Sequence, residues 1–399
     1  MFSKIVTVVF FFFLLFHVAK GNPHGKKVKK FLVINGVPAT PEAFEKVREE
    51  FKDNNNLRIG VGFIISYLRD TREKTEETLR QYLRLSQQFD MPLVIQLDGE
   101  QWWQGRPDLW NWWDETKPGY NPENKKNVEW TDWTPDSAVK IGWRNWGKQI
   151  RVLPMPNLMS PVYREACHIE MARLVRIVVQ WYKQLPARRK DLLIALKVGW
   201  ESAIGVNNYY YPGGNSYKEQ PVENDPKGPL KPDVLPGRGV AAIGYAAVST
   251  LGLAKSGALN PADIAEVIKV HLTDLSKLAH DMGVPRKKLF THCGGWSQGE
   301  QLYLSALNKY SCPGWSFYKY ASNPAMDSTA MKAVRASNAP YWGIVEWALL
   351  GKKTREQWLL ALKNSLAVPG VRYMCIYNWK GLQKNEPGKA AIKEYLSTQ

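Results

Sequence analysis

Two glutamates occupy positions where a charged side chain is costly. Glu201 ends the apolar run LKVGWE, and Glu346 lies inside the apolar run WGIVEWA. Burying a carboxylate among apolar residues costs free energy unless the group is paired or used. One such residue is equally well explained as a structural carboxylate. Two of them at one pocket favour chemistry, as general acid, general base or nucleophile.

The elements that would carry these glutamates form a regular series. Eight short apolar runs recur along the chain, and most are followed by a stretch with helical periodicity. Most runs are continuous rather than alternating, which is typical of parallel strands buried on both faces. The predicted strands are 31–35, 57–66, 91–98, 192–201, 288–293, 314–318, 341–347 and 371–379. This α/β pattern predicts a single (β/α)8 TIM barrel, with an open doubly wound sheet as the alternative.

Helix start signals support the same alternation. Thr40, Ser160 and Asn260 each precede a proline, which places a capping side chain before the first helical position. Thr354 begins a capping box. Two large insertions, 99–160 and 202–258, follow strands three and four. Both should therefore lie at the carboxyl end of the barrel, where such folds keep their active sites.

The amino terminus resembles a secretion signal. Residues 1–21 combine a short basic start, an apolar run and small residues suited to cleavage. We therefore expect residues 22–399 to form one secreted, extracellular domain, with no membrane attachment after signal cleavage. In an oxidising compartment, Cys293 and Cys312 are the expected disulfide pair, whereas Cys167 and Cys375 are expected to be buried free thiols.

The overall charge of the chain favours an anionic partner but does not identify it. The 399-residue chain has a formal net charge of +17, which favours anionic surfaces such as acidic polysaccharides. No nucleic-acid motif is present, so nucleic acid is not an expected partner. The cysteine spacings do not suggest a zinc site, and no metal or other cofactor is implied. The sequence does not determine the oligomeric state.

Several further polar and aromatic residues fall at predicted strand ends. His292 ends strand five, Tyr318 ends strand six, and Tyr377, Asn378 and Trp379 close strand eight. The carboxyl ends of all strands converge on one pocket in a barrel. We therefore expect these side chains to surround the two glutamates, with Tyr318 and His292 orienting them.

These positions resemble those of the retaining glycosidases of clan GH-A. In that clan the acid/base glutamate follows strand four and the nucleophile lies at strand seven, which corresponds to Glu201 and Glu346. The resemblance also implies a sugar platform at Trp379 and a tyrosine, Tyr318, that bonds the nucleophile. It departs at Trp200, where most members carry an asparagine that contacts the sugar 2-hydroxyl. The implied activity is hydrolysis of a β-linked oligo- or polysaccharide.

Tryptophans dominate the first insertion. The stretch LDGEQWWQGRPDLWNWWDE contains Asp98, Glu100, Trp102 and Trp103 near its start. Indole rings can stack on the C–H faces of sugars, and polar neighbours can bond their hydroxyls, so these four residues and Trp200 are expected to bind substrate. For about half of the tryptophans of this insertion, we expect a role in its own small core.

Two alternative functions remain open from the sequence. The segment ending in Asp98 and Glu100 resembles the end of a chitinase-like acidic motif, although it closes strand three and lacks the earlier aspartate. A non-catalytic carbohydrate-binding barrel would use Glu201 and Glu346 only as hydrogen-bonding groups. An anionic glycan suits the basic charge, while a neutral glucan, mannan or galactan suits the aromatic residues equally well.

Overall fold

The computed structural model describes residues 29–54, 56–145, 149–205, 208–210, 241–294 and 300–398. The expected signal peptide, 1–21, and most of the second insertion lie outside these residues. Within them, no helix is long and apolar enough to cross a membrane.

Eight parallel strands close into a barrel, which confirms the predicted TIM-barrel fold and excludes the open sheet. The strand order is β1-β11-β10-β9-β8-β6-β3-β2. Seven strands begin and end within two residues of the predicted bounds, but the last ends at Ile376 rather than Trp379. The strands are β1 Lys30–Asn35, β2 Leu57–Ser66, β3 Leu93–Asp98, β6 Leu193–Ser202, β8 Leu289–Cys293, β9 Gly314–Phe317, β10 Trp342–Trp347 and β11 Val371–Ile376.

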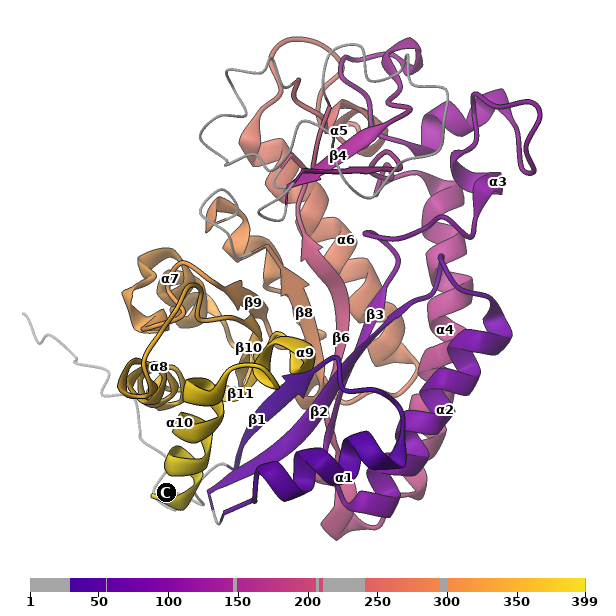
Figure 1. Ribbon diagram of the computed structural model, residues 1–399. Helices are drawn as coiled ribbons and strands as arrows, with labels where there is room; N and C mark the ends of the chain where they lie inside the picture. Colours follow the sequence, from indigo (N-terminus) through magenta and orange to yellow (C-terminus); the bar gives the residue numbers. More distant parts are fainter. Residues whose placement is uncertain are drawn as a thin grey trace, which may run out of the picture.

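Helices cover the outside of the barrel (Figure 1). The main ones are α1 Pro41–Glu50, α2 Arg72–Phe89, α4 Pro161–Gln184, α6 Pro261–Asp281, α7 Ser328–Ala336, α8 Arg355–Ala367 and α10 Glu386–Ser397. The four predicted caps are confirmed: Thr40, Ser160 and Asn260 each accept a backbone N–H, and Thr354 forms a complete capping box. Each cap satisfies an otherwise unpaired amide of the first helical turn.

The two insertions are joined by a small antiparallel sheet that the sequence did not predict. Strand β4 (Gly142–Asn145) of the first insertion pairs with β5 (Gln149–Val152) and with β7 (Asn208–Tyr209) of the second. With the short helices α3 (Pro107–Trp110) and α5 (Tyr245–Leu251), it lies beyond the carboxyl end of the barrel, at the top of Figure 1. The described parts of both insertions therefore lie at the end of the barrel where the candidate site was expected.

The barrel interior has its own apolar cluster, separate from the larger core between strands and helices. Its buried members include Phe31, Val94, Phe290, Val345 and Tyr373. The interior is thus filled with side chains, as is usual for eight strands. A site at the carboxyl end of the barrel would therefore lie beyond this cluster.

The expected Cys293–Cys312 disulfide is wrong, because both thiols are free and buried. Strand register explains why: Cys293 pairs with Trp315, whereas Cys312 pairs with Phe290. The two cysteines are therefore offset by three residues along neighbouring strands, about 10 Å at a strand rise of about 3.3 Å per residue. A disulfide requires Cα atoms closer than about 7 Å. Cys167 and Cys375 are buried free thiols, as predicted.

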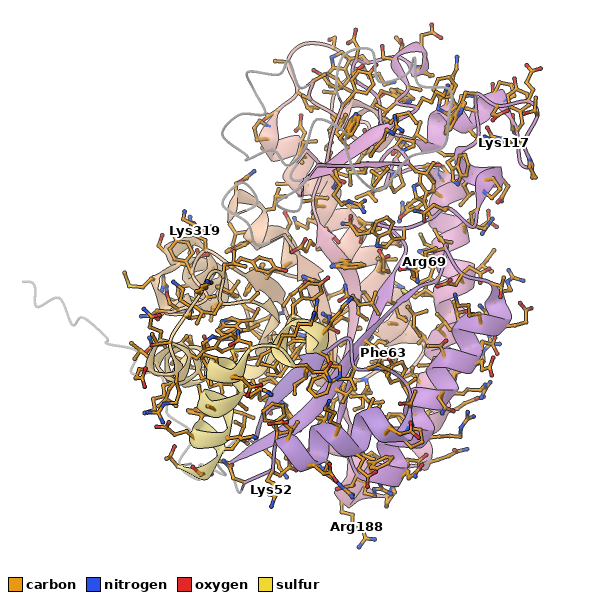
Figure 2. All side chains as sticks on the ribbon, in the orientation of Figure 1. Lys52, Phe63, Arg69, Lys117, Arg188 and Lys319 are labelled. Carbon is orange, nitrogen blue, oxygen red and sulfur yellow. The ribbon has the colours of Figure 1, made fainter. Side chains whose placement is uncertain are left out.

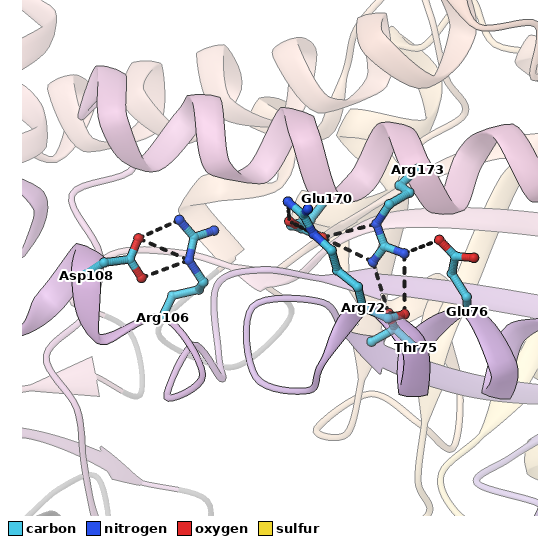
Figure 3. Close-up of polar contacts among 7 residues, drawn as sticks. All are labelled: Arg72, Thr75, Glu76, Arg106, Asp108, Glu170 and Arg173. Atoms are coloured by element: carbon cyan, nitrogen blue, oxygen red, sulfur yellow. Dashed lines mark hydrogen bonds and ion pairs between the residues drawn. The ribbon is translucent and has the colours of Figure 1, made fainter. Parts of the chain in front are cut away.

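An ion-pair network fastens α2 to α4 (Figure 3). The side chain of Glu170 is only 5% exposed and accepts from Arg72 at 2.5 Å and from Arg173 at 3.1 Å. Arg173 also pairs with Glu76 and bonds the Thr75 hydroxyl. A nearly buried carboxylate with two guanidinium partners links the helices more firmly than an exposed pair would.

Basic side chains are spread over the molecule. In Figure 2, Lys52 and Arg188 lie at the amino end of the barrel, Lys117 lies on the insertions at the opposite end, and Lys319 lies near α7. Basic side chains therefore occur at both ends of the barrel among the described residues.

Candidate active site

The three titratable residues expected at the pocket come together. One ligand atom from each of Glu201, His292 and Glu346 lies within 4.8 Å of the other two. Glu201 comes from the end of β6 and Glu346 from β10, with β8 and β9 between these two strands in the closed barrel. Retaining glycosidases place their two carboxyl groups about 5–5.5 Å apart, and inverting ones about 6.5–9.5 Å apart. The short separation suits the retaining arrangement.

Glu346 is buried and held by two donors. The Tyr318 hydroxyl donates to its Oε1 at 2.7 Å, and the Trp200 side chain forms a second hydrogen bond. Burial raises the pKa of Glu346, while Lys197 and these two donors pull it down. Burial and the neighbouring Glu346 carboxylate raise the pKa of Tyr318, which keeps its hydroxyl protonated as a donor. The polar partners therefore favour the ionised carboxylate against the cost of burial.

Lys197 was missed by the sequence reasoning, although it interrupts an apolar run in the same way as Glu346. It is 2% exposed, and its Nζ crosses from β6 to donate to the Val345 carbonyl at 2.9 Å. Burial lowers the pKa of Lys197, while nearby anionic groups, including Glu346 and Glu201, raise it. A buried cation below the carboxylates offsets their mutual repulsion.

His292 is neutral, with a tautomer that its neighbours determine. The Gln96 side-chain amide donates to the Gly199 carbonyl at 2.9 Å, so the same nitrogen must be a donor toward His292 Nδ1 at 3.1 Å. The ring proton is therefore on Nε2, which bonds Ser316 Oγ at 2.7 Å and lies 3.6 Å from Glu346 Oε2. Burial lowers the pKa of His292 well below its usual value.

This tautomer bears on metal binding. The three groups are close enough to hold an ion, but a metal ligand must offer a lone pair. Nδ1 of His292 accepts from Gln96, and Nε2 carries the proton. The side chain is 0% exposed, so it orients the site from below. The arrangement suits a carboxylate pair better than a metal centre.

Asp98 and Glu100 are structural, contrary to the expectation that they bind sugar. Asp98 is 0% exposed and Glu100 is 4% exposed. Asp98 accepts from two backbone amides and from Ser66 Oγ, each at 2.9 Å. Glu100 accepts from Ser202 and His271. Because these bonds direct both carboxyls into the protein, the chitinase-like alternative loses its proposed acid.

At the end of β11, the exposed aromatic residue is Tyr377 rather than Trp379. Tyr377 is 40% exposed, and burial together with the Glu346 carboxylate raises its pKa. Trp379 begins the short helix α9 (Trp379–Leu382) and is 5% exposed. Asn378 caps that helix through a bond from Gly381 N. Since β11 ends three residues before Trp379, the helix directs this indole into the core, and its expected platform role is not supported.

The tryptophans of the first insertion divide as expected between a core and partly exposed positions. Among those described, the buried ones are Trp103, Trp110, Trp130 and Trp143, and the half-buried ones are Trp102, Trp112, Trp113 and Trp133. Trp103 is 1% exposed and its indole donates to the Pro154 carbonyl at 3.2 Å. Its burial contradicts the expectation that it contacts substrate.

Arg144, on β4, is a second residue that the sequence reasoning missed. Its guanidinium lies 4.8 Å from the ring centre of Trp102 and donates to the Gln101 carbonyl at 3.0 Å. Burial lowers the pKa of Arg144 to about 10, while the Asp98 and Glu201 carboxylates raise it. The insertion thus places a guanidinium, packed on the Trp102 indole, within electrostatic range of Glu201. Nothing in the local sequence distinguishes Arg144 from an exposed arginine.

Comparisons with known proteins concern the fold. No family model matches the sequence, and no curated protein matches it. A broad specificity family 5 endoglucanase from an uncultured bacterium is 10% identical, with a TM-score of 0.44, over 90% of this chain and 85% of that one. A family 5 glycoside hydrolase from Prevotella bryantii is 8% identical, with a TM-score of 0.43, over 93% and 96%.

A third solved structure is a family 5 xyloglucanase from Bacteroides ovatus in complex with a heptasaccharide. It is 10% identical, with a TM-score of 0.44, over 93% of this chain and 75% of that one. At this level the similarity concerns the fold alone. The fold is established by the closed parallel strand order of the chain itself: the protein is a (β/α)8 barrel.

Proposed function

We propose that the protein is a retaining glycoside hydrolase that acts on a β-linked oligo- or polysaccharide. The observation that carries the proposal is the pair of buried glutamates whose carboxylate oxygens lie within 4.8 Å of each other. Glu346 would attack the anomeric carbon as the nucleophile. Glu201 would protonate the leaving oxygen and then take a proton from the water that releases the product.

The surrounding residues support these roles. The Tyr318 hydroxyl and the Trp200 indole stabilise the ionised form of Glu346 before attack. Trp200 occupies the position where related barrels carry asparagine, and its donor is directed to the carboxylate. Tyr377 is exposed and Trp102 is partly exposed, so both could contact a sugar ring.

We further propose that the glycan carries an anionic group and that the protein is secreted. The positive field of the buried Arg144 guanidinium and the net charge of +17 favour substrates that carry an anionic group. We also infer secretion, from the signal-like segment 1–21.

The test is digestion of a panel of β-linked glycans by the purified protein and by Glu201→Gln and Glu346→Gln. We expect Glu346→Gln to abolish turnover while folding and glycan binding are retained, because the amide keeps the shape but cannot attack. Normal turnover by Glu346→Gln would contradict the assignment. Binding without cleavage by all three proteins would instead identify a carbohydrate-binding barrel.

A further inference from the structure

The backbone at Glu201 has an unusual conformation. Glu201 has φ of +49°, and Gly199, two residues earlier, has φ of +77°. The left-handed region is unfavourable for a residue with a side chain, and it persists only where the surroundings enforce it. The register between β6 and β8 also shifts between Val198 and Ser202. Something must hold this segment in place.

Three side chains from the end of β3 bond the segment on both sides of Glu201. Gln96 Nε2 donates to the Gly199 carbonyl at 2.9 Å. Gln101 Nε2 donates to the Trp200 carbonyl at 2.7 Å. On the far side, Ser202 Oγ donates to Glu100 Oε1 at 2.8 Å. Gln96, Glu100 and Gln101 are here called the β3 clamp.

The clamp is itself held in shape. Asp98 Oδ1 accepts from the backbone amides of Glu100 and Gln101, each at 2.9 Å, which folds the chain so that both side chains turn toward β6. His271, from α6, supports Glu100 through a contact of 3.0 Å. All three clamp residues are buried. The acidic pair at the head of the tryptophan-rich stretch therefore has an internal role.

The fit leaves little space for the segment to move. A Cβ added to Gly199 would lie 2.4 Å from Ser202 Oγ and 3.2 Å from Glu100 Oε1. A Cβ added to Gly99, within the clamp loop, would lie 2.4 Å from the Tyr67 hydroxyl oxygen. Neither position has space for a side chain, because neighbouring atoms approach both glycines closely. The loop after β3 and the end of β6 are therefore tightly packed.

We propose that the β3 clamp holds Glu201 in the left-handed conformation and so directs its carboxyl group toward Glu346. Gln96, Glu100 and Gln101 are positioning residues, since they act through the backbone of Glu201. The effect on catalysis rests on the proposed function, whereas the effect on conformation does not. The two parts can therefore be tested separately.

The conformational test uses glycine and alanine at position 201 as a reporter. Glycine tolerates positive φ, whereas at ordinary φ alanine is the more stabilising residue. We expect Glu201→Gly to melt at a higher temperature than Glu201→Ala in the otherwise native chain. In a background carrying Gln101→Met and Ser202→Ala, this advantage should shrink by at least half or reverse. An unchanged advantage, or none in the native chain, would overturn the proposal.

The matched control background carries Gln104→Met. Gln104 is exposed and lies three residues from Gln101 in the same loop, so this change should leave the glycine advantage as it is. Loss of the advantage in the control as well would show general loosening of the loop and would also overturn the proposal.

The catalytic test compares kcat and KM. Gln101→Met should lower kcat on the order of tenfold or more and leave KM within about twofold, because misdirecting an acid affects the transition state more than binding. Gln104→Met should change neither. A change in KM alone would contradict the positioning role. If the native protein cleaves no glycan, the proposed function fails, and the melting comparison still decides whether the clamp exists.

Discussion

Replacing Tyr318 with phenylalanine removes a single hydroxyl from the site. That hydroxyl donates to Glu346 Oε1 at 2.7 Å, and a hydrogen bond to a charged group contributes about 1.5–3 kcal/mol. Since about 1.36 kcal/mol corresponds to a factor of ten in rate, kcat/KM should fall by about 10-fold to 160-fold. The fall should be largest at acidic pH, where loss of the bond leaves more of Glu346 protonated and unable to attack.

The pH dependence of Tyr318→Phe gives a sharper test than the rate. The hydroxyl pulls the pKa of Glu346 down against burial, so its removal should raise that pKa. A nucleophile must be ionised, and therefore the acid limb of kcat/KM should move to higher pH. The assay is a pH–rate profile with a chromogenic β-glycoside, with Tyr320→Phe as the matched control. An acid limb that stays in place would refute the assigned role of Glu346.

Three further predictions concern stability. Glu170→Ala should lower the free energy of unfolding by about 2–4 kcal/mol in urea titrations, because it leaves two arginines without their nearly buried partner. The control is Asp136→Ala, which removes a carboxylate that is 93% exposed and should change the free energy of unfolding by less than about 1 kcal/mol. Burial raises the pKa of Glu129 to about 8 from 4.5, so the folded state binds a proton that the unfolded state has lost, and the free energy of unfolding should decline as the pH rises from 6.5 to 8. Burial lowers the pKa of His292, which makes the free energy of unfolding rise with pH, but only below about pH 6.5. Glu129→Gln should remove that decline, and an equal decline in the variant would contradict the assignment. Because all four cysteines are free, dithiothreitol should leave the melting temperature unchanged, and a drop would reveal a disulfide.

The barrel could be predicted because its signals are local and repeated. Continuous apolar runs and capping residues such as Thr40 and Thr354 reflect short-range physics that each segment carries by itself. Glu346 and Lys197 stand out by the same reasoning, since a charged residue within a buried strand needs a partner. The glutamate was identified and the lysine was not, although the signal was equally strong.

The remaining site residues depend on contacts that sequence spacing does not encode. Trp379 was expected at a strand end, but the chain turns into a helix after Ile376 and buries the indole. Arg144 comes within electrostatic range of Glu201 in a small sheet, where β4 pairs with β7 across two insertions. The predicted Cys293–Cys312 disulfide was wrong for a related reason, because cysteines on neighbouring strands can be offset by several residues.

The pairing of β4 with β7 has a consequence for how such a protein could diversify. Loops at the mouth of a barrel are usually free to change length and sequence one at a time. Here a change in the first insertion alters the edge to which the second is bonded, through Trp143 opposite Tyr209 and Arg144 opposite Asn208. New specificities would therefore arise through paired changes in both insertions, and grafting either one alone onto another barrel would transfer half of a sheet.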